Sequence, residues 1–175
     1  SHPVYDYELL RNTNKALIES IGLPMGLTHS EYKFYKGKFY LIEAGARGGG
    51  SNLSGKIVPY MSGVDNYEYL IKEALGQSVD QKKLDQLHLP EQRCVVMRFF
   101  DFGEGIVKKV YGKEYLKHNA SVIDYQLEIH EGDKLENPKY GRLRPGHFIV
   151  GAETYEEAQK LTQDILENVH VVFEV

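Results

Sequence analysis

The stretch from residue 28 to residue 52, THSEYKFYKGKFYLIEAGARGGGSN, constrains the fold of this chain more than any other. Residues 28–35 and 39–44 are rich in aromatic, aliphatic and β-branched side chains, which favour strands. Between them, residues 36–38 (Lys-Gly-Lys) form a turn signal centred on a glycine. The sequence therefore predicts a β-hairpin that ends in an arginine and a run of glycines.

The register of this hairpin decides whether two acidic side chains meet. Glu31 and Glu43 lie at equal distances from Gly37, so a three-residue loop with a left-handed Gly37 at its apex places them opposite each other. Side chains alternate between faces along a strand, whereas a strict two-residue turn would put the acids on opposite faces. The face of the two acids is then expected to carry Lys33, Tyr35, Phe39 and Leu41.

Two carboxylates that face each other across a strand pair repel, with Cβ atoms roughly 4.5 to 5.5 Å apart. A raised pKa with a shared proton offsets this repulsion, and so does a hard divalent cation such as Mg²⁺. Arg47 follows four residues after Glu43 and suits a phosphate or a carboxylate. The glycines at 48–50 allow a ligand to approach the backbone closely. Together these residues indicate a metal–nucleotide site that activates a phosphoryl or acyl group.

This arrangement resembles the C-terminal half of the ATP-grasp domain. The resemblance rests on the two acids twelve residues apart, the arginine and glycines after the second acid, and the flanks GLTHSEY (26–32) and IVPYMSGVDNYEYLIKEALG (57–76). It is closest to the carboxylate–amine ligase and carbamoyl-phosphate-synthase-like branch. RLRPGHFIVGAETYEEA (142–158) resembles, more weakly, the small C-terminal lid that follows the grasp domain.

The resemblance implies an α+β fold, in which an antiparallel sheet with helices is followed by a strand-rich lid. We expect the grasp portion at residues 1–89 and the lid at 90–175, with a linker at 89–92 (Leu-Pro-Glu-Gln). Helices are predicted over 8–21, 53–61, 65–76 and 78–87, and after Thr154, while strand-like runs recur from residue 93 onward.

The resemblance also implies roles for individual residues. Glu31 and Glu43 would hold two Mg²⁺ ions, with Mn²⁺ as an alternative, and Arg47 would contact transferring phosphoryl and acyl oxygens. The Gly50 N–H would contact the substrate carboxylate, and His29 would contact ATP. ATP would phosphorylate a small carboxylate, and an amine or ammonia would then attack the acyl carbon.

Each of these residues also has an ordinary structural interpretation. The two glutamates are then solvated surface acids, Arg47 a salt-bridge partner, the glycines a flexible turn and His29 a packed histidine. In addition, many ATP-grasp members carry Asn two residues after the second acid, where this chain has Gly45. We interpret Gly45 as a subfamily trait that leaves the metal with one protein ligand fewer.

The resemblance places the adenine-binding half of the grasp domain upstream of residue 1. We therefore expect a fragment of an ADP-forming ligase that has little activity alone. The alternative is a non-catalytic split or degenerate module that pairs with another chain. An apolar strip on the other face of the hairpin would mark where the missing half docks, or a second copy of the chain in its place: Tyr32, Phe34, Tyr40 and Ile42.

Two further patterns point to nucleotide phosphate. GSNLSGK (50–56) matches the first seven positions of a P-loop, but Ile57 follows where the P-loop needs Ser or Thr for Mg²⁺. Arg142, Arg144 and His147 are candidates to reach phosphate from the lid, although a structural turn is the stronger interpretation of RLRPG.

Composition narrows the environment of the protein. The net charge of −4 argues against a nucleic-acid-binding surface, and no apolar run is long enough to cross a membrane. The single cysteine, Cys94, excludes a disulfide within the chain and favours a reducing compartment. We expect a cytoplasmic protein.

Overall fold

The computed structural model describes residues 4–78, 93–137 and 144–174. Its contacts divide the chain into two compact units, residues 1–59 with 64–86 and residues 60–63 with 87–175, here called the first and second units. The boundary predicted between residues 89 and 90, the linker at 89–92 and the helix predicted at 78–87, from residue 79 onward, lie outside the described residues.

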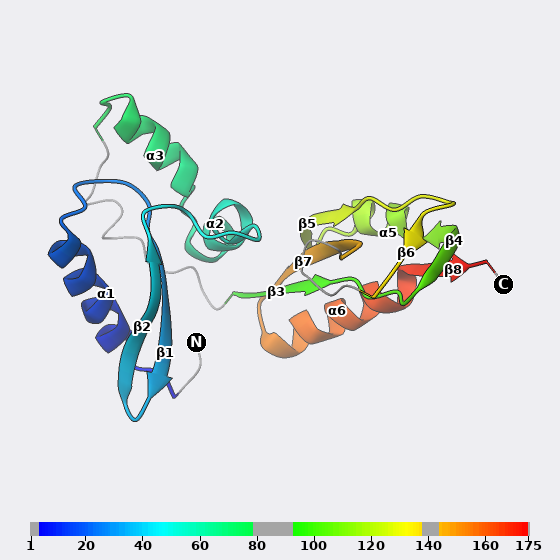
Figure 1. Cartoon of the computed structure of the whole chain (residues 1–175), viewed down its shortest axis with the longest axis horizontal. Helices are drawn as coiled ribbons and strands as arrows, with labels where there is room; N and C mark the ends of the chain where they lie inside the picture. Colours follow the sequence, from blue (N-terminus) through cyan, green and yellow to red (C-terminus); the bar gives the residue numbers. More distant parts are fainter. Residues whose placement is uncertain (1–3, 79–92, 138–143, 175) are drawn as a thin grey trace. The chain divides into compact units, whose positions relative to one another are not determined.

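The first unit begins with helix α1 (Tyr7–Ile21), which lies along the hairpin in Figure 1. The Asp6 side chain caps this helix by accepting a hydrogen bond from the Leu9 N–H, and the helix ends at Gly22 in the left-handed conformation. After the hairpin come a π-helix, η1 (Leu53–Ile57), and the helices α2 (Val58–Ser62) and α3 (Asn66–Ala74).

The hairpin consists of β1 (His29–Tyr35) and β2 (Lys38–Gly45), joined by a turn of two residues rather than three. Lys36 and Gly37 both have positive φ, at 47° and 75°, as a type I′ turn requires. The predicted three-residue loop is therefore wrong, because the chain reverses through the tight turn that best matches the twist of the strands.

A β-bulge corrects the register between this turn and the acids. Tyr32 pairs with Leu41, but the next pair is Glu31 with Glu43, so Ile42 is the extra residue on β2. One inserted residue moves the following side chains of its strand to the other face. The bulge thus brings the two glutamates opposite each other despite the two-residue turn.

Near the turn, the faces differ from the prediction. Phe39 pairs with Phe34 and Leu41 with Tyr32, so neither shares the face of the acids. The Phe34 and Phe39 rings are 4.9 Å apart between centroids, and the Tyr32 hydroxyl donates a hydrogen bond of 3.0 Å to Asn14 on α1. This aromatic face packs against α1.

The four residues of the predicted apolar strip consequently do not share one face of the hairpin. Tyr32 and Phe34 are half-buried against the chain's own helix and aromatic side chains. Tyr40 pairs with Lys33 on the face of the acids and is 50% exposed, and Ile42, at the bulge, is 65% exposed. The strip is not one continuous docking surface.

The described residues of the second unit from 93 onward form two antiparallel sheets with the helices α5 and α6, which can be followed in Figure 1. One sheet has the order β3-β7-β5, the other β6-β4-β8. Its elements are β3 (Cys94–Phe99), β4 (Gly105–Tyr111), α5 (Lys113–His118), β5 (Val122–Leu127), β6 (Lys134–Leu135), β7 (Gly146–Ala152), α6 (Tyr155–Asn168) and β8 (His170–Phe173). All strand pairs among the described residues are antiparallel, which confirms the predicted α+β class.

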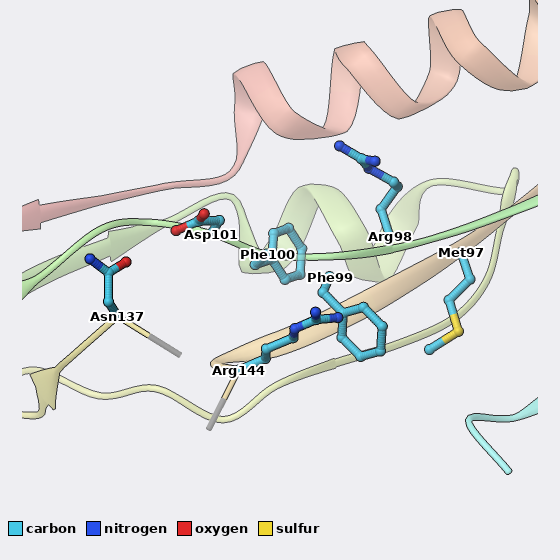
Figure 2. Close-up of a pocket in the computed structure, with 7 residues that line it drawn as sticks. All are labelled: Met97, Arg98, Phe99, Phe100, Asp101, Asn137 and Arg144. Atoms are coloured by element: carbon cyan, nitrogen blue, oxygen red, sulfur yellow. The ribbon is translucent and has the colours of Figure 1, made fainter. Parts of the chain in front are cut away.

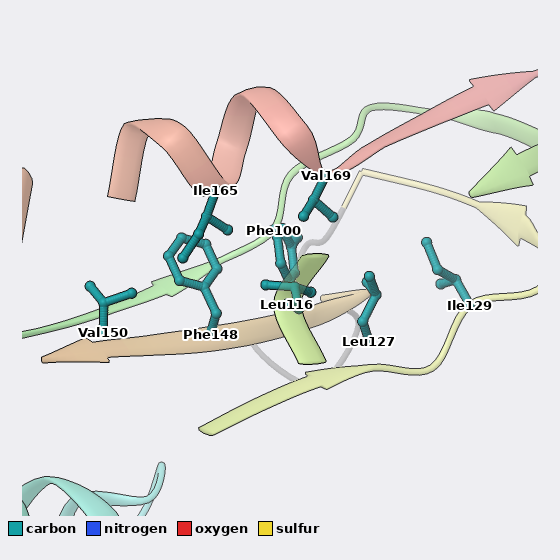
Figure 3. Packing of buried hydrophobic residues seen from close by; sticks show 8 residues of the cluster. All are labelled: Phe100, Leu116, Leu127, Ile129, Phe148, Val150, Ile165 and Val169. Atoms are coloured by element: carbon teal, nitrogen blue, oxygen red, sulfur yellow. The ribbon is translucent and has the colours of Figure 1, made fainter. Parts of the chain in front are cut away.

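The fully buried apolar side chains of the described residues all belong to the second unit. Figure 3 shows the central cluster of these side chains, to which α6, β7 and α5 contribute. The central cluster contains Phe100, Leu116, Leu127, Ile129, Phe148, Val150, Ile165 and Val169. No helix in the described part of the chain is long and apolar enough to span a bilayer.

Gly112 joins β4 to α5, a helix that the sequence did not indicate, and its backbone demands glycine for two reasons. Its φ is 86°, and an added Cβ would lie 2.3 Å from the Asn168 carbonyl oxygen. A Gly112→Ala variant should lose about 1–2 kcal/mol of unfolding free energy for the left-handed alanine and about 1–3 kcal/mol more for the clash. Urea denaturation of the full chain measures the loss.

Gly132→Ala is the matched control, because Gly132 has φ 89° but nothing within 4 Å of an added Cβ. It should lose only the conformational part, about 1–2 kcal/mol. Equal losses in the two variants would show that the contact with Asn168 is unimportant.

Candidate functional site

The two predicted acids lie opposite each other on the hairpin, and each is paired with a cationic or titratable neighbour. The Arg47 Nη2 lies 3.1 Å from the Glu43 Oε1, and the His29 Nε2 lies 3.1 Å from the Glu31 Oε1. The Glu31 and Glu43 side chains are 53% and 56% exposed. Both carboxylates are therefore oriented by a partner while remaining accessible from solvent.

Arg47 links the acids to the glycines that follow. Besides its ion pair with Glu43, its Nη1 donates a hydrogen bond of 3.0 Å to the Gly48 carbonyl oxygen. The salt bridge that the ordinary interpretation expects is thus present. An exposed pair of this kind contributes only about 0–1 kcal/mol, so an incoming anion can compete for the guanidinium.

His29 lies between the hairpin and the glycine loop, which here means residues 48–52. Its side chain is 23% exposed, and an added Cβ at Gly49 would lie 2.9 Å from its Nδ1. One ring nitrogen therefore faces Glu31 and the other faces the loop. The geometry agrees with the packed, hydrogen-bonded histidine and leaves contact with ATP as a hypothesis.

The glycine loop is packed on one side and open on the other. Added Cβ atoms at Gly48 and Gly49 would lie 2.9 Å from the Ser54 Oγ and 3.1 Å from the Leu53 Cβ, respectively. At Gly50, by contrast, nothing lies within 4 Å of an added Cβ. Of the three glycines, Gly50 is the exposed one with free space at the Cβ position, and its contact with a substrate stays a hypothesis.

The loop continues through strained backbone into η1. Ser51 and Asn52 are consecutive non-glycine residues with φ of 50° and 59°, and the Asn52 carbonyl accepts the N–H groups of Lys56 and Ile57. Such strain and π-helical turns are concentrated at functional sites. The all-antiparallel sheets of the described residues exclude the parallel sheet of a P-loop protein, so Lys56 does not belong to a P-loop.

The donor set fits magnesium held jointly by protein and phosphate. In the described part of the chain, no group of three or more His, Cys, Asp or Glu side chains is arranged to hold a metal. Mg²⁺ commonly takes only one or two carboxylates and completes its shell with water and substrate phosphates. Glu31 and Glu43 are such a pair, because they share one face of the hairpin.

A hollow of about 460 Å³ lies along β3 in the second unit. Figure 2 shows Arg144 stacked on the Phe99 ring, 4.3 Å from its centroid, while Arg98 projects from the opposite side of the strand. His147 is buried, 3.8 Å from the Asp124 carboxylate, and Arg142 lies outside the described residues. These contacts agree with the structural interpretation of the RLRPG segment, while a role of Arg144 and His147 toward phosphate stays a hypothesis.

Comparison with solved structures identifies the fold. The model superimposes on L-amino acid ligase from Bacillus licheniformis with a TM-score of 0.77 and 22% identity, over 99% of this chain and 45% of that one. For phosphoribosylglycinamide synthetase from Anaerococcus prevotii, the values are 0.80 and 16%, over 99% and 44%. A biotin carboxylase complex from Campylobacter jejuni gives 0.65 and 19%, over 98% and 38%. Comparison with curated protein sequences gives no match.

The chain therefore has the fold of the C-terminal portion of an ATP-grasp enzyme, as its sequence resemblance implied. Within it, residues 98–174 match the family model of L-amino acid ligase C-terminal domain 2. The chain spans less than half the length of each of these three solved structures.

The supports of the glycine loop, Ser54 and Tyr67, escaped the sequence analysis. The Ser54 hydroxyl accepts a hydrogen bond of 2.7 Å from the Gly49 N–H, and the Tyr67 hydroxyl would lie 3.3 Å from a Cβ at Gly48. Ser54 lies inside the P-loop-like stretch at residues 50–56, in which the pattern singles out Lys56 and not the serine. Tyr67 lies beyond the loop on α3, and no local pattern connects it to residue 48.

Replacing Gly49 should disturb His29, whereas replacing Gly50 should not. A Gly49→Ala methyl collides with the His29 ring and Leu53, so we expect a loss of about 1–3 kcal/mol in unfolding free energy and shifted His29 imidazole NMR signals. Gly50→Ala is the matched control, with free space around its methyl group. Unchanged His29 signals in Gly49→Ala would contradict the placement of the ring.

Proposed function

We propose that this chain carries the magnesium–phosphate end of an ATP-dependent carboxylate–amine ligase site. The observation that carries the proposal is the cross-strand pairing of Glu31 with Glu43, with Arg47 bound to the second acid. The similarity to L-amino acid ligase, both of the fold and of residues 98–174, favours ligation over other ATP-dependent reactions.

In this proposal, a substrate carboxylate attacks the γ-phosphorus of ATP, and the bond to the bridging oxygen breaks to release ADP. The amine nitrogen then attacks the acyl carbon of the resulting acyl phosphate, loses a proton and expels inorganic phosphate. Arg47 stabilises the negative charge on the phosphoryl and acyl oxygens, and the Gly50 N–H donates to the substrate carboxylate. His29 orients Glu31 and contacts ATP.

The two carboxylates supply what a bound metal needs at this position. When Mg²⁺ or Mn²⁺ is bound, it neutralises charge on the phosphates during transfer. Glu43 would be the better candidate to hold both ions, because its partner Arg47 also donates a hydrogen bond to the glycine loop at Gly48. Gly45 presents no side chain for a further ligand, so substrate oxygens complete the shell.

A non-catalytic module that pairs with another chain is the second candidate. In its favour, the described residues of the first unit include no fully buried apolar side chain. Tyr35, Tyr40, Leu41 and Ile42 on the hairpin are all at least 46% exposed. Exposed apolar side chains of this kind suit contact with the upstream half of an ATP-grasp protein or with a second copy of the chain.

Metal binding distinguishes the proposed site at Glu31 and Glu43 from the P-loop-like stretch at residues 50–56. We expect Glu31→Ala and Glu43→Ala each to weaken Mn²⁺ binding, measured by electron paramagnetic resonance, at least about tenfold, and to abolish detectable binding of Mn-ATP. Lys56→Ala is the control and should change neither affinity. Loss of nucleotide binding in Lys56→Ala, with Glu43→Ala unaffected, would contradict the proposed site.

The chain alone should turn over ATP far more slowly than an ordinary enzyme, well below about 1 s⁻¹. The reason is that this part of the fold supplies the acids and the arginine, while the resemblance assigns the adenine pocket and further phosphate contacts to the other half. Phosphate release with Mg-ATP and mixed L-amino acids measures the rate. Turnover near 1 s⁻¹ that disappears in Glu43→Ala would refute this prediction.

A further inference from the structure

Ser54 is the most buried of the described side chains in the first unit, at 8% exposure, although it is polar. Its hydroxyl oxygen accepts a hydrogen bond of 2.7 Å from the Gly49 N–H. A buried serine of this kind is costly unless its hydroxyl is satisfied, and here the partner is the backbone of the glycine loop. The contact therefore stabilises one conformation of that loop.

Ser54 is itself held rigidly beneath the loop. It is the second residue of η1. The N-cap of this helix is Asn52, and the Asn52 carbonyl accepts hydrogen bonds from the N–H groups of Lys56 and Ile57. The Asn66 side-chain amide, at the start of α3, donates to the Ser54 carbonyl at 3.4 Å. Two consecutive left-handed residues precede this turn, and such strain persists only where surrounding contacts enforce it.

The contacts of the loop separate a supported side from an open side. On the supported side, Gly48 and Gly49 have no room for a Cβ because Ser54, Tyr67, His29 and Leu53 lie against them. On the open side, Gly50 has free space. The Ser54 hydrogen bond to Gly49 lies one peptide away from this open position.

We infer that Ser54 is a positioning residue, which fixes the Gly49 peptide so that the loop presents Gly50 to an anionic oxygen. This inference rests on the proposed function, because it gives the open side of the loop a ligand. The oxygen belongs to a phosphoryl group or to a carboxylate, since backbone N–H groups recognise both. Ser54 touches neither ligand and acts through the backbone.

The test compares Ser54→Ala with Ser20→Ala in the full chain. Both variants remove a hydroxyl from the first unit, but the Ser20 hydroxyl is exposed and donates within α1, to the Leu17 carbonyl. The readouts are hydrogen exchange of the Gly49 amide, Mn²⁺ affinity, and the affinities for inorganic tripolyphosphate with Mn²⁺ and for L-alanine. Tripolyphosphate tests binding of a phosphoryl group, and L-alanine tests binding of a carboxylate.

We expect Ser54→Ala to speed exchange of the Gly49 amide about tenfold, as loss of one buried hydrogen bond implies. At least one anion probe should bind about five- to tenfold more weakly, while Mn²⁺ affinity is unchanged because Glu31 and Glu43 are intact. Ser20→Ala should alter none of these values. A ligand-specific loss without loss of metal affinity is the result that a purely structural serine would not give.

Unchanged affinity for both anions in Ser54→Ala would overturn the inference, and so would a parallel fall in Mn²⁺ affinity, which indicates general disruption of the site. If the unmodified chain binds no Mn²⁺, the proposed function fails instead. The Gly49 amide then still decides whether Ser54 fixes the loop, because equal exchange rates in the two variants would overturn that role independently.

Discussion

The geometry of the site depends on one inserted residue in the hairpin. The type I′ turn at Lys36 and Gly37 would by itself place Glu31 and Glu43 on opposite faces, and the bulge at Ile42 returns them to the same face. A bulge interrupts the regular ladder of hydrogen bonds between strands. The resulting pair of like charges is unfavourable as well, so neither feature is explained by the stability of the hairpin alone.

The magnitudes of the charge interactions indicate what the site still requires. Two exposed carboxylates separated by a few Å repel by at most about 1 kcal/mol in water, and an exposed ion pair such as Glu43 with Arg47 contributes a similar amount of the opposite sign. Without a ligand, the repulsion between the acids and the attraction to Arg47 thus nearly cancel in free energy. A divalent cation shared by both carboxylates would reverse the sign of the interaction, and phosphate oxygens would in turn replace Glu43 as the partner of Arg47.

Sequence reasoning reached the class of the fold and the opposition of the two acids, because both follow from patterns spaced along one strand pair. It gave the right register for the wrong reason, since a three-residue turn and a two-residue turn with a bulge produce the same pairing at Glu31. Strand periodicity cannot distinguish these two solutions. It therefore misplaced Phe39 and Leu41, which lie between the turn and the bulge.

The remaining omissions have a common cause. Helix α5 is only six residues long, so it is too short to show a clear helical periodicity in the sequence, and the glycine before it, Gly112, lies against Asn168 at the end of α6. Ser54 and Tyr67 support the glycine loop from two later helical segments, and that relation exists only in the folded chain. The sequence allows residues to be proposed for a site from their own chemical type, whereas residues that support other residues become visible only in the structure.

The two units achieve order by different means, and this affects how the site can respond to a ligand. The second unit has a continuous apolar core, whose burial opposes local opening. In the first unit, the described residues around the acids are held by individual hydrogen bonds and ion pairs, each worth about 1 kcal/mol. Contacts of that size can be exchanged for ligand contacts without unfolding. The glycine loop thus lies outside the apolar core, and one of its peptides is fixed by the buried hydroxyl of Ser54.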